Sequence, residues 1–224
     1  MIKAIYFDLF FTLIVPRYQN TDTEYDILNL SVTEWENYAE NDALYKERAL
    51  GLIKAEEVII DKIISAIPFK VSHLQKEKVL LAREDRMKAA LENVSIEIFD
   101  TLKCLKDKNI KIGLISNADV IDCKHWKQSQ LSSLFDDAIF SCNVGMLKPD
   151  RRIYELAMNH LNVLPTECMF VGDGGSNELY GAKSVGMKTI FTEALELKAD
   201  QKRISIMEHA DYHVKCFREI LDCI

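Results

Sequence analysis

Four short stretches of this 224-residue sequence carry polar side chains suited to hydrolytic chemistry. An apolar run ends on Asp8, and Ser116, Lys148 and Asp173 each fall at, or shortly after, the end of a later predicted strand. A carboxylate can attack phosphorus, an ammonium can neutralise charge on a transferring group, and carboxylates supply the hard oxygen ligands that Mg²⁺ prefers. Each residue alone has an ordinary structural explanation, such as a helix cap, but the four together outline a candidate site.

The elements that must position these residues alternate between strands and helices after residue 95. Strands are expected at 110–116, 138–141, 168–172, 187–191 and 212–214, and helices near 95–109, 120–128, 150–161, 177–185 and 216–221. Strands separated by helices imply right-handed crossovers and a mostly parallel sheet. Because ligands bind beyond the carboxyl ends of such strands, we expect the four polar residues near one rim of the sheet.

Residues from about 17 to 93 have a different, almost entirely helical pattern. Two capping boxes, which open helices, occur in this region. They are Ser31-Val-Thr-Glu34 and Ser72-His-Leu-Gln75. The pattern predicts a helical insert that separates the first strand from the rest of the sheet. The expected domains are therefore an α/β core of residues 1–16 and 94–224 and a helical domain of residues 17–93.

Composition and charge argue against several classes of function. The chain is 48% hydrophobic and 28% charged, as in ordinary soluble domains. Its net charge of −7 and pI near 5.3 argue against a nucleic-acid partner. No apolar stretch reaches the roughly 18 residues of a membrane span, and Asp8 interrupts the N-terminal run, which lacks a signal-peptide cleavage site. The sequence therefore predicts a cytoplasmic protein without nucleic-acid or membrane partners, and it leaves the oligomeric state unknown.

In order and character the four stretches resemble the haloacid dehalogenase-like (HAD) hydrolase superfamily. Besides the segment around Asp8, the resemblance rests on Leu-Ile-Ser-Asn at 114–117, Leu-Lys-Pro-Asp at 147–150 and Gly-Asp-Gly-Gly-Ser-Asn-Glu at 172–178. It covers the whole chain and implies a HAD-type Rossmann-like α/β core, with a mostly parallel sheet flanked by helices. The insert at 17–93 matches the subfamily whose small, all-helical cap domain follows the first motif.

The resemblance implies roles for the polar residues. Asp8 is expected to be the nucleophile, and Lys148 to neutralise charge on the transferring group and orient Asp8. Ser116 is expected to hydrogen-bond a phosphoryl oxygen, with help from backbone N–H groups near Asn117 and Phe10. Thr12 would supply a second hydroxyl, with a structural turn residue as an equal alternative.

The same resemblance implies Mg²⁺ as the cofactor. Its expected protein ligands are Asp8, the backbone carbonyl of Phe10, and Asp173, so phenylalanine at position 10 need not prevent metal binding. Glu178 stands where the family usually has an aspartate, and it could hold the metal through water or pair with the lysine. Asn177 is expected beside Glu178, behind the metal ligands.

One departure from the family pattern bears on mechanism. The usual Asp-x-Asp-x-Thr has Phe10 in place of the second aspartate, which in HAD phosphatases protonates the leaving oxygen and then activates water. Help of this kind contributes about 10²–10⁴-fold, and phenylalanine cannot transfer a proton, although its backbone N–H can still contact substrate. Phe11 also replaces the usual glycine, which makes the entrance beside Asp8 more apolar.

Three functions remain open from the sequence. The favoured one is a Mg²⁺-dependent phosphatase that acts on a small phosphorylated metabolite through an aspartyl-phosphate. The leaving group of the substrate would then need no proton, or would take one from a cap residue or from the substrate itself. The second is a metal-free 2-haloacid dehalogenase, a branch that commonly has an aromatic residue at position 10 but serine in place of Asp173. The third is a non-catalytic role in binding a phosphorylated ligand or a partner protein.

Substrate choice is expected to depend on the cap, which closes over the site. The candidate cap residues are Arg17 and Tyr18, just past the first linker, and Tyr45, Lys46 and Arg48, on a predicted helix that could face the rim. Each of them is more typical of solvated surface than of a ligand contact.

Overall fold

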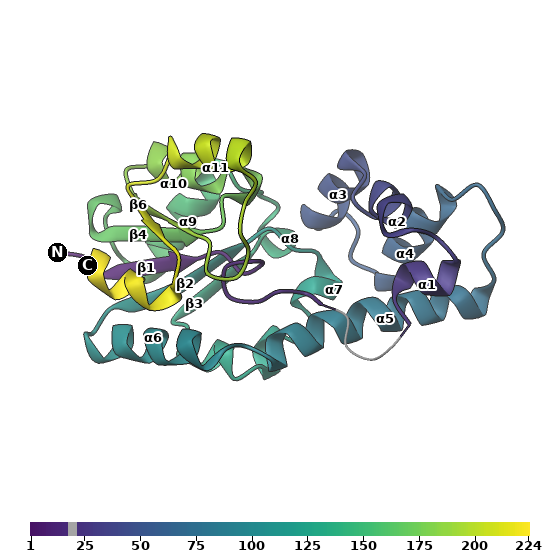
Figure 1. Ribbon diagram of the computed structural model, residues 1–224, viewed down its shortest axis with the longest axis horizontal. Helices are drawn as coiled ribbons and strands as arrows, with labels where there is room; N and C mark the ends of the chain where they lie inside the picture. Colours follow the sequence, from purple (N-terminus) through teal and green to yellow (C-terminus); the bar gives the residue numbers. More distant parts are fainter. Residues whose placement is uncertain (18–21) are drawn as a thin grey trace.

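The computed structural model describes residues 1–17 and 22–224, which form a three-layer α/β/α core with a group of helices beside it (Figure 1). Six strands make one parallel sheet in the order β3-β2-β1-β4-β5-β6. They are β1 (Ala4–Phe7), β2 (Lys111–Ser116), β3 (Asp137–Phe140), β4 (Cys168–Gly172), β5 (Lys188–Thr192) and β6 (Tyr212–Val214). The parallel α/β fold predicted from the sequence is confirmed.

Helices cover both faces of this sheet. On one face lie α9 (Arg151–Leu161), α10 (Glu178–Ser184) and α11 (Asp200–Met207), and on the other lie α6 (Ile96–Asp107) and the 3₁₀ helix η5 (Phe217–Cys223) (Figure 1). The side chains of β1 alternate between the two apolar clusters, with Ile5 and Phe7 on the α6 side and Ala4 and Tyr6 on the α9 side. All four are fully buried, as expected for a central strand between two helical layers.

Shorter elements connect the strands. They are α7 (Val120–Cys123), η1 (Trp126–Gln128), η2 (Leu131–Leu134), α8 (Ser141–Val144), η3 (Pro165–Glu167) and η4 (Gly175–Asn177). The single helix expected at 120–128 is therefore wrong, because α7 ends at Cys123 and the chain turns. Trp126 then packs edge-on against Phe135 and Phe140, contacts with later residues that the local pattern does not reveal.

Five helices lie between β1 and α6 in the sequence and to one side of the sheet in space (Figure 1). These inserted helices are α1 (Glu24–Leu28), α2 (Val32–Ala39), α3 (Asp42–Ala49), α4 (Glu56–Ser65) and α5 (His73–Glu92). The capping boxes expected at Ser31 and Ser72 are both present. An apolar cluster of their own, with Ile59 and Val79 fully buried, extends to Ile121 of α7. The boundaries at 16/17 and 93/94 stay predictions.

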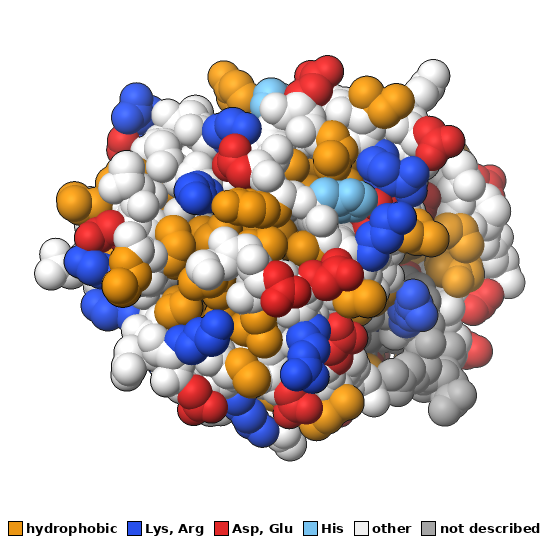
Figure 2. Space-filling view, turned by 60° about the vertical axis from the view of Figure 1, so that its left-hand side comes forward, with side chains coloured by type: hydrophobic (Ala, Val, Ile, Leu, Met, Phe, Trp, Pro, Cys, Tyr) orange, Lys and Arg blue, Asp and Glu red, His pale blue; other side chains and the backbone are white. Residues whose placement is uncertain are grey.

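The surface is mixed in character. Figure 2 shows one face, on which basic and acidic side chains are interspersed with apolar ones. Within the described ranges, none of the helices has both the length and the apolarity that crossing a bilayer requires.

Candidate active site

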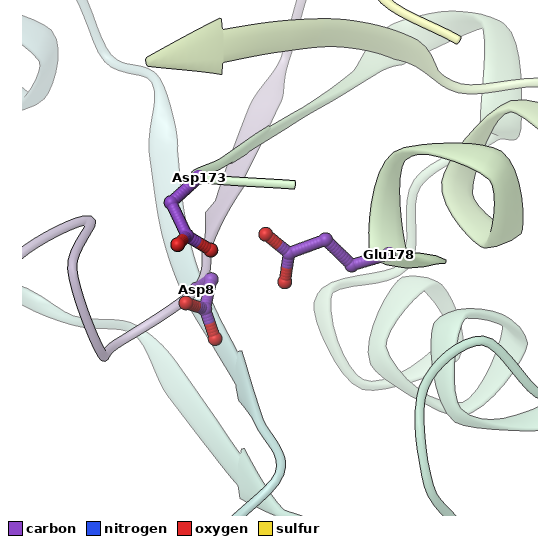
Figure 3. A group of neighbouring side chains, drawn as sticks. All are labelled: Asp8, Asp173 and Glu178. Carbon is purple, nitrogen blue, oxygen red and sulfur yellow. The ribbon is translucent and has the colours of Figure 1, made fainter. Parts of the chain in front are cut away.

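Asp8 and Asp173 directly follow the neighbouring strands β1 and β4, at the carboxyl edge of the sheet. The backbone N–H of Asp8 donates to the carbonyl of Val171 at 2.9 Å, which fixes the backbone position of Asp8 at the end of the strand. Figure 3 shows Asp8, Asp173 and Glu178 turned toward one another. One carboxylate oxygen from each lies within 4.8 Å of the other two, and all three residues are buried. This edge therefore concentrates negative charge out of water.

Lys148 balances part of that charge. Its Nζ donates to Asp8 Oδ1 and to Glu178 Oε2, each at 2.5 Å, and the residue is only 4% exposed. Burial alone would lower the pKa of Lys148, but the charges of Asp8 and Glu178 outweigh burial and raise that pKa above its ordinary value. Lys148 is therefore a fixed ammonium at neutral pH.

The pKa values of Asp8 and Glu178 are both raised, which means that their ionised forms are destabilised in this setting. Burial raises the pKa of Asp8, the attraction of Lys148 opposes this, and the charge of Asp173 adds to the rise. Burial and the nearby Asp8 raise the pKa of Glu178 well above its usual range. Ionised carboxylates this crowded and this dry are stabilised by a further positive charge.

Glu178 fits the site by folding back over Gly172. A Cβ atom added at Gly172 would lie 2.0 Å from Glu178 Oε1, so a larger residue there would displace this carboxylate from its observed position. The same oxygen accepts a hydrogen bond from the N–H of Gly174 at 3.1 Å. Of the two roles the sequence left open for Glu178, pairing with the lysine is the contact observed, and the longer side chain is thereby accommodated.

The two residues predicted to supply hydroxyl groups, Thr12 and Ser116, are both fully buried. Thr12 Oγ1 donates to Asp8 Oδ2 at 3.4 Å. Ser116 is the last residue of β2, and its Oγ has no hydrogen-bond partner among the described residues. An unpaired buried hydroxyl costs free energy, so an acceptor such as a phosphoryl oxygen would be favourable there.

The two asparagines behave differently. Asn117 holds the backbone of Lys148 from both sides: its Nδ2 donates to the Lys148 carbonyl at 3.2 Å, and its Oδ1 accepts from the Lys148 N–H at 2.8 Å. Asn117 therefore positions the lysine. Asn177 is exposed just before α10, and the structure does not bring its side chain into the carboxylate group.

Two cavities meet at this rim. The carboxylate cavity, of about 380 Å³, is lined by the three carboxylates and Lys148. The aromatic cavity, of about 420 Å³, lies toward the inserted helices, and its wall combines five aromatic residues with charged and aliphatic ones. Phe10, Phe11, Tyr45 and Asn117 line both cavities, so the two cavities adjoin each other.

Comparison with known proteins identifies this architecture. The model of the haloacid dehalogenase-like hydrolase family matches residues 2–186. The chain belongs to that family. Among curated relatives, the glyceraldehyde 3-phosphate phosphatase of Pyrococcus furiosus is 32% identical over 130 residues, 55% of this chain and 51% of the relative. The bifunctional epoxide hydrolase 2 of Rattus norvegicus is 33% identical over 106 residues, 45% of this chain and 19% of the relative. The chain thus spans about half the length of the first of these relatives, and less of the second.

Solved HAD structures share the fold. A HAD family enzyme from Bacteroides thetaiotaomicron, in complex with magnesium and inorganic phosphate, superposes with a TM-score of 0.68 at 19% identity, covering 90% of this chain and 99% of that one. A 2-haloacid dehalogenase from Pseudomonas syringae superposes with a TM-score of 0.63 at 21% identity, covering 99% and 97%. At such identities the likeness establishes the fold, and the predicted HAD membership and hydrolase class are confirmed by the family match.

This HAD protein departs from the family pattern at Phe10 and Phe11. Phe11 has a φ of 59°, in the left-handed region that favours glycine, and its N–H donates to the carbonyl of Ile14 at 2.7 Å. The phenylalanine therefore keeps a glycine-type turn at some conformational cost. The rings of Phe10 and Phe11 thus occupy the positions at which the family pattern has an aspartate and a glycine.

Lys198 is a charged residue of the site that none of the four sequence segments includes. Its Nζ donates to Asp173 Oδ2 at 2.5 Å and also pairs with Glu196, and the residue is only 7% exposed. The buried carboxylate of Glu193 accepts from its backbone N–H at 2.7 Å. The available signal was position, because Lys198 lies in the loop after β5, at the same carboxyl edge as the motifs.

Two of the candidate residues on the inserted helices lie at the site. Tyr45 lines both cavities. Burial raises the pKa of its hydroxyl, and the charge of Lys148 and hydrogen bonds with Ser176 and Asn117 partly oppose this rise. Arg48 lines the aromatic cavity and is 2% exposed, so the expectation of a solvated surface residue was wrong for it. The remaining candidates are exposed or undescribed: Arg17 and Lys46 are exposed, and Tyr18 lies outside the described residues.

Arg48 and Arg83 join the inserted helices to the core through Asp119. Arg48 Nη1 donates to Asp119 Oδ2 at 2.5 Å, and Arg83 Nη2 donates to the same oxygen at 2.8 Å and to Asp122 Oδ1 at 3.0 Å. Asp119 is fully buried and also caps α7 by accepting from the N–H groups of Ile121 and Asp122. One core carboxylate thus joins α3 and α5 to the start of α7.

Proposed function

We propose that this HAD hydrolase is a Mg²⁺-dependent phosphatase of a small phosphorylated compound, with Asp8 as the nucleophile. The observation that carries the proposal is the buried cluster of Asp8, Lys148, Asp173 and Glu178 at the carboxyl edge of β1 and β4. The family match supports hydrolase chemistry, and the similarity to a glyceraldehyde 3-phosphate phosphatase supports a phosphate monoester as substrate.

The residues present fit a magnesium ion. Three carboxylates are the hard oxygen donors that Mg²⁺ prefers, and against them stand two ammonium groups, Lys148 and Lys198. With all three carboxylates ionised, these five groups carry one net negative charge, and Glu196, which shares Lys198, adds to it. Asp8, Asp173 and the carbonyl of Phe10 would hold the ion, with Glu178 behind them, and the ion when bound would withdraw charge from the transferring phosphoryl group.

The chain's own residues would act around Asp8. Its carboxylate oxygen would attack phosphorus in line and form an aspartyl-phosphate, which water then hydrolyses. Lys148 would orient Asp8 and stabilise the added negative charge, while Ser116 would hydrogen-bond a phosphoryl oxygen. Thr12, at 3.4 Å from Asp8, would fix the rotamer of the nucleophile.

Release of inorganic phosphate from p-nitrophenyl phosphate and acetyl phosphate tests the proposal. Both have leaving groups that need little protonation, so the missing acid at position 10 should matter least for them. We expect turnover that falls at least tenfold after metal removal with EDTA and returns with excess MgCl₂. Unchanged turnover in EDTA would show that the metal assignment is wrong.

A second prediction concerns Lys198 and does not depend on turnover. Because its ammonium occupies Asp173, a divalent cation must displace it, and Lys198→Met should make metal binding about tenfold tighter by removing that competing charge. Calorimetric titration with Mg²⁺, or titration with Mn²⁺ followed by its electron paramagnetic resonance signal, measures the change.

Lys202→Met is the matched control, because Lys202 lines the same cavity but is exposed. It should leave the metal affinity within about twofold of the unsubstituted protein, since exposed charges are screened. Equal or weaker metal binding in Lys198→Met would mean that Lys198 supports the metal site instead of competing with it.

A 2-haloacid dehalogenase is the second candidate, and Phe10 is the observation that favours it. Halide leaves without a proton, so an aromatic residue at this position is compatible with that reaction. Asp173 and Glu178 weigh against it, because two further buried carboxylates would repel a haloacid anion. Chloride release from chloroacetate that is insensitive to EDTA would reverse our preference.

A further inference from the structure

The aromatic cavity adjoins the nucleophile through the two phenylalanines that depart from the family pattern. Five aromatic residues line it: Phe10, Phe11, Tyr25, Trp35 and Tyr45. With a volume of about 420 Å³ it has room for a substituted ring. A group attached to phosphorus in the carboxylate cavity would extend past Phe10 and Phe11 into this space, because both residues line both cavities.

The charges around the cavity disfavour a second anionic group on the ligand. Two of its guanidinium groups, Arg48 and Arg83, share the buried Asp119. The third, Arg86, pairs with the fully buried Glu24 at 2.9 Å. Glu40 pairs with Arg48 at 2.8 Å, and Glu36 also lines the cavity. Each of the three arginines therefore already has a carboxylate partner, so an uncharged group fits this cavity better than a second carboxylate does.

The missing acid selects the same kind of group by an independent route. Phe10 cannot donate a proton to the leaving oxygen, and a general acid is worth about 10²–10⁴-fold for a poor leaving group. Phenols are much stronger acids than alkanols, so an aryl oxygen can leave as the anion. The lining of the cavity and the missing acid therefore both favour an uncharged aromatic leaving group.

We propose that the aromatic cavity holds the uncharged aromatic leaving group of an aryl phosphate monoester. The inference rests on the proposed phosphatase function and names its substrate class. The bond from Asp8 to phosphorus forms as the phosphorus–oxygen bond to the ring breaks, and the aryloxide leaves with the electron pair. Water then cleaves the aspartyl-phosphate to inorganic phosphate and Asp8, and the proton released from water goes to the aryloxide or to solvent.

The binding test uses phosphonates, which cannot be hydrolysed, so affinity is measured apart from reactivity. We expect phenylphosphonate to bind at least tenfold more tightly than propylphosphonate in calorimetric titrations, because the ring buries more apolar area against the aromatic wall. 4-Carboxyphenylphosphonate should bind more weakly than phenylphosphonate. Equal affinities for phenyl- and propylphosphonate, or tighter binding of the carboxylated compound, would overturn the inference.

The turnover test compares phenyl phosphate with propyl phosphate by release of inorganic phosphate. We expect kcat/KM to be at least 10²-fold higher for the aryl ester. Equal rates would overturn the aryl assignment while supporting the phosphatase. Tight binding of phenylphosphonate without hydrolysis of either ester would support the cavity assignment and overturn the phosphatase, so the two failures are distinguishable.

Val32 offers a variant that leaves the core intact. It lines the aromatic cavity at the start of α2 yet is 46% exposed, so Val32→Asp adds a carboxylate to the wall without opening a void. We expect the preference for phenylphosphonate over propylphosphonate to fall at least threefold. Val58→Asp, at a 43% exposed position on α4 outside the cavity, should leave the preference unchanged. An unchanged preference in Val32→Asp would contradict the inference.

Discussion

Asp8→Asn should abolish turnover, lowering kcat by on the order of 10⁴-fold or more, as expected when a covalent nucleophile is lost. The amide keeps the shape of the carboxylate but is a far weaker nucleophile, and it cannot form the aspartyl-phosphate. Phosphate release under saturating substrate measures the loss. Rapid-quench mass spectrometry should find a phosphorylated protein only when Asp8 is present.

The substitution should not unfold the protein. Burial raises the pKa of Asp8, so its ionised form costs folding free energy above that pKa, and the cost is relieved as the pH falls. A neutral amide avoids this cost, and Lys148 keeps its contact with Glu178. We expect a Tm at pH 7.5 equal to or above that of the unsubstituted protein. Asp107→Asn, at the exposed end of α6, is the activity control, and residual turnover in Asp8→Asn above a few per cent of that control would refute the mechanism.

Asp119→Asn should produce the largest loss of stability, about 3–5 kcal/mol in the free energy of unfolding. Asparagine can still cap α7, but it leaves Arg48 and Arg83 buried with too little opposing charge. Urea unfolding at pH 7 measures the cost. Asp150→Asn is the matched control, because Asp150 caps α9 but pairs with the largely exposed Arg152, and we expect a change below about 1 kcal/mol.

The cost of Asp119→Asn should also depend on pH. Burial would raise the pKa of Asp119, but Arg83 and Arg48 more than reverse this and hold it below its ordinary value of 3.8. A depressed carboxylate pKa contributes stability that is present above the unfolded value and lost as the pH falls through the folded value. The difference between the two proteins should therefore shrink below about pH 4. A difference that stays constant down to pH 3 would mean that the charge of Asp119 is not what stabilises the fold.

The core was largely predictable because its signals are local. Buried parallel strands form short apolar runs, and each expected strand lies within about two residues of the observed one. Asp8, Lys148 and Asp173 could be grouped for the same reason, since the ends of parallel strands meet at one edge. The helix α11 escaped notice, and its weak amphipathic pattern explains why: only Ile206 among its residues is buried.

The remaining site residues were not predictable because their partners are distant in sequence. Arg48 has the local pattern of a solvated residue on a polar helix, and its burial depends on Asp119, 71 positions later. The role of Asn117 in holding Lys148 joins residues 31 positions apart. For Lys198, the partner Asp173 lies 25 positions earlier, and no spacing rule links a lone lysine to it.

The anchoring of Lys198 has a consequence for how such proteins diversify. Glu193 holds the backbone of Lys198, and His213 and Arg203 hold Glu193 in turn, at 2.8 Å and 3.0 Å. All of these residues lie outside the four segments that carry the resemblance to the family, and outside residues 2–186, which the family model matches. Substitutions at these positions, in the loop after β5, α11 and β6, would therefore change the charge around Asp173 while the four segments stay the same. The affinity of the carboxylate group for a cation would then depend on residues that are distant in sequence from the four segments.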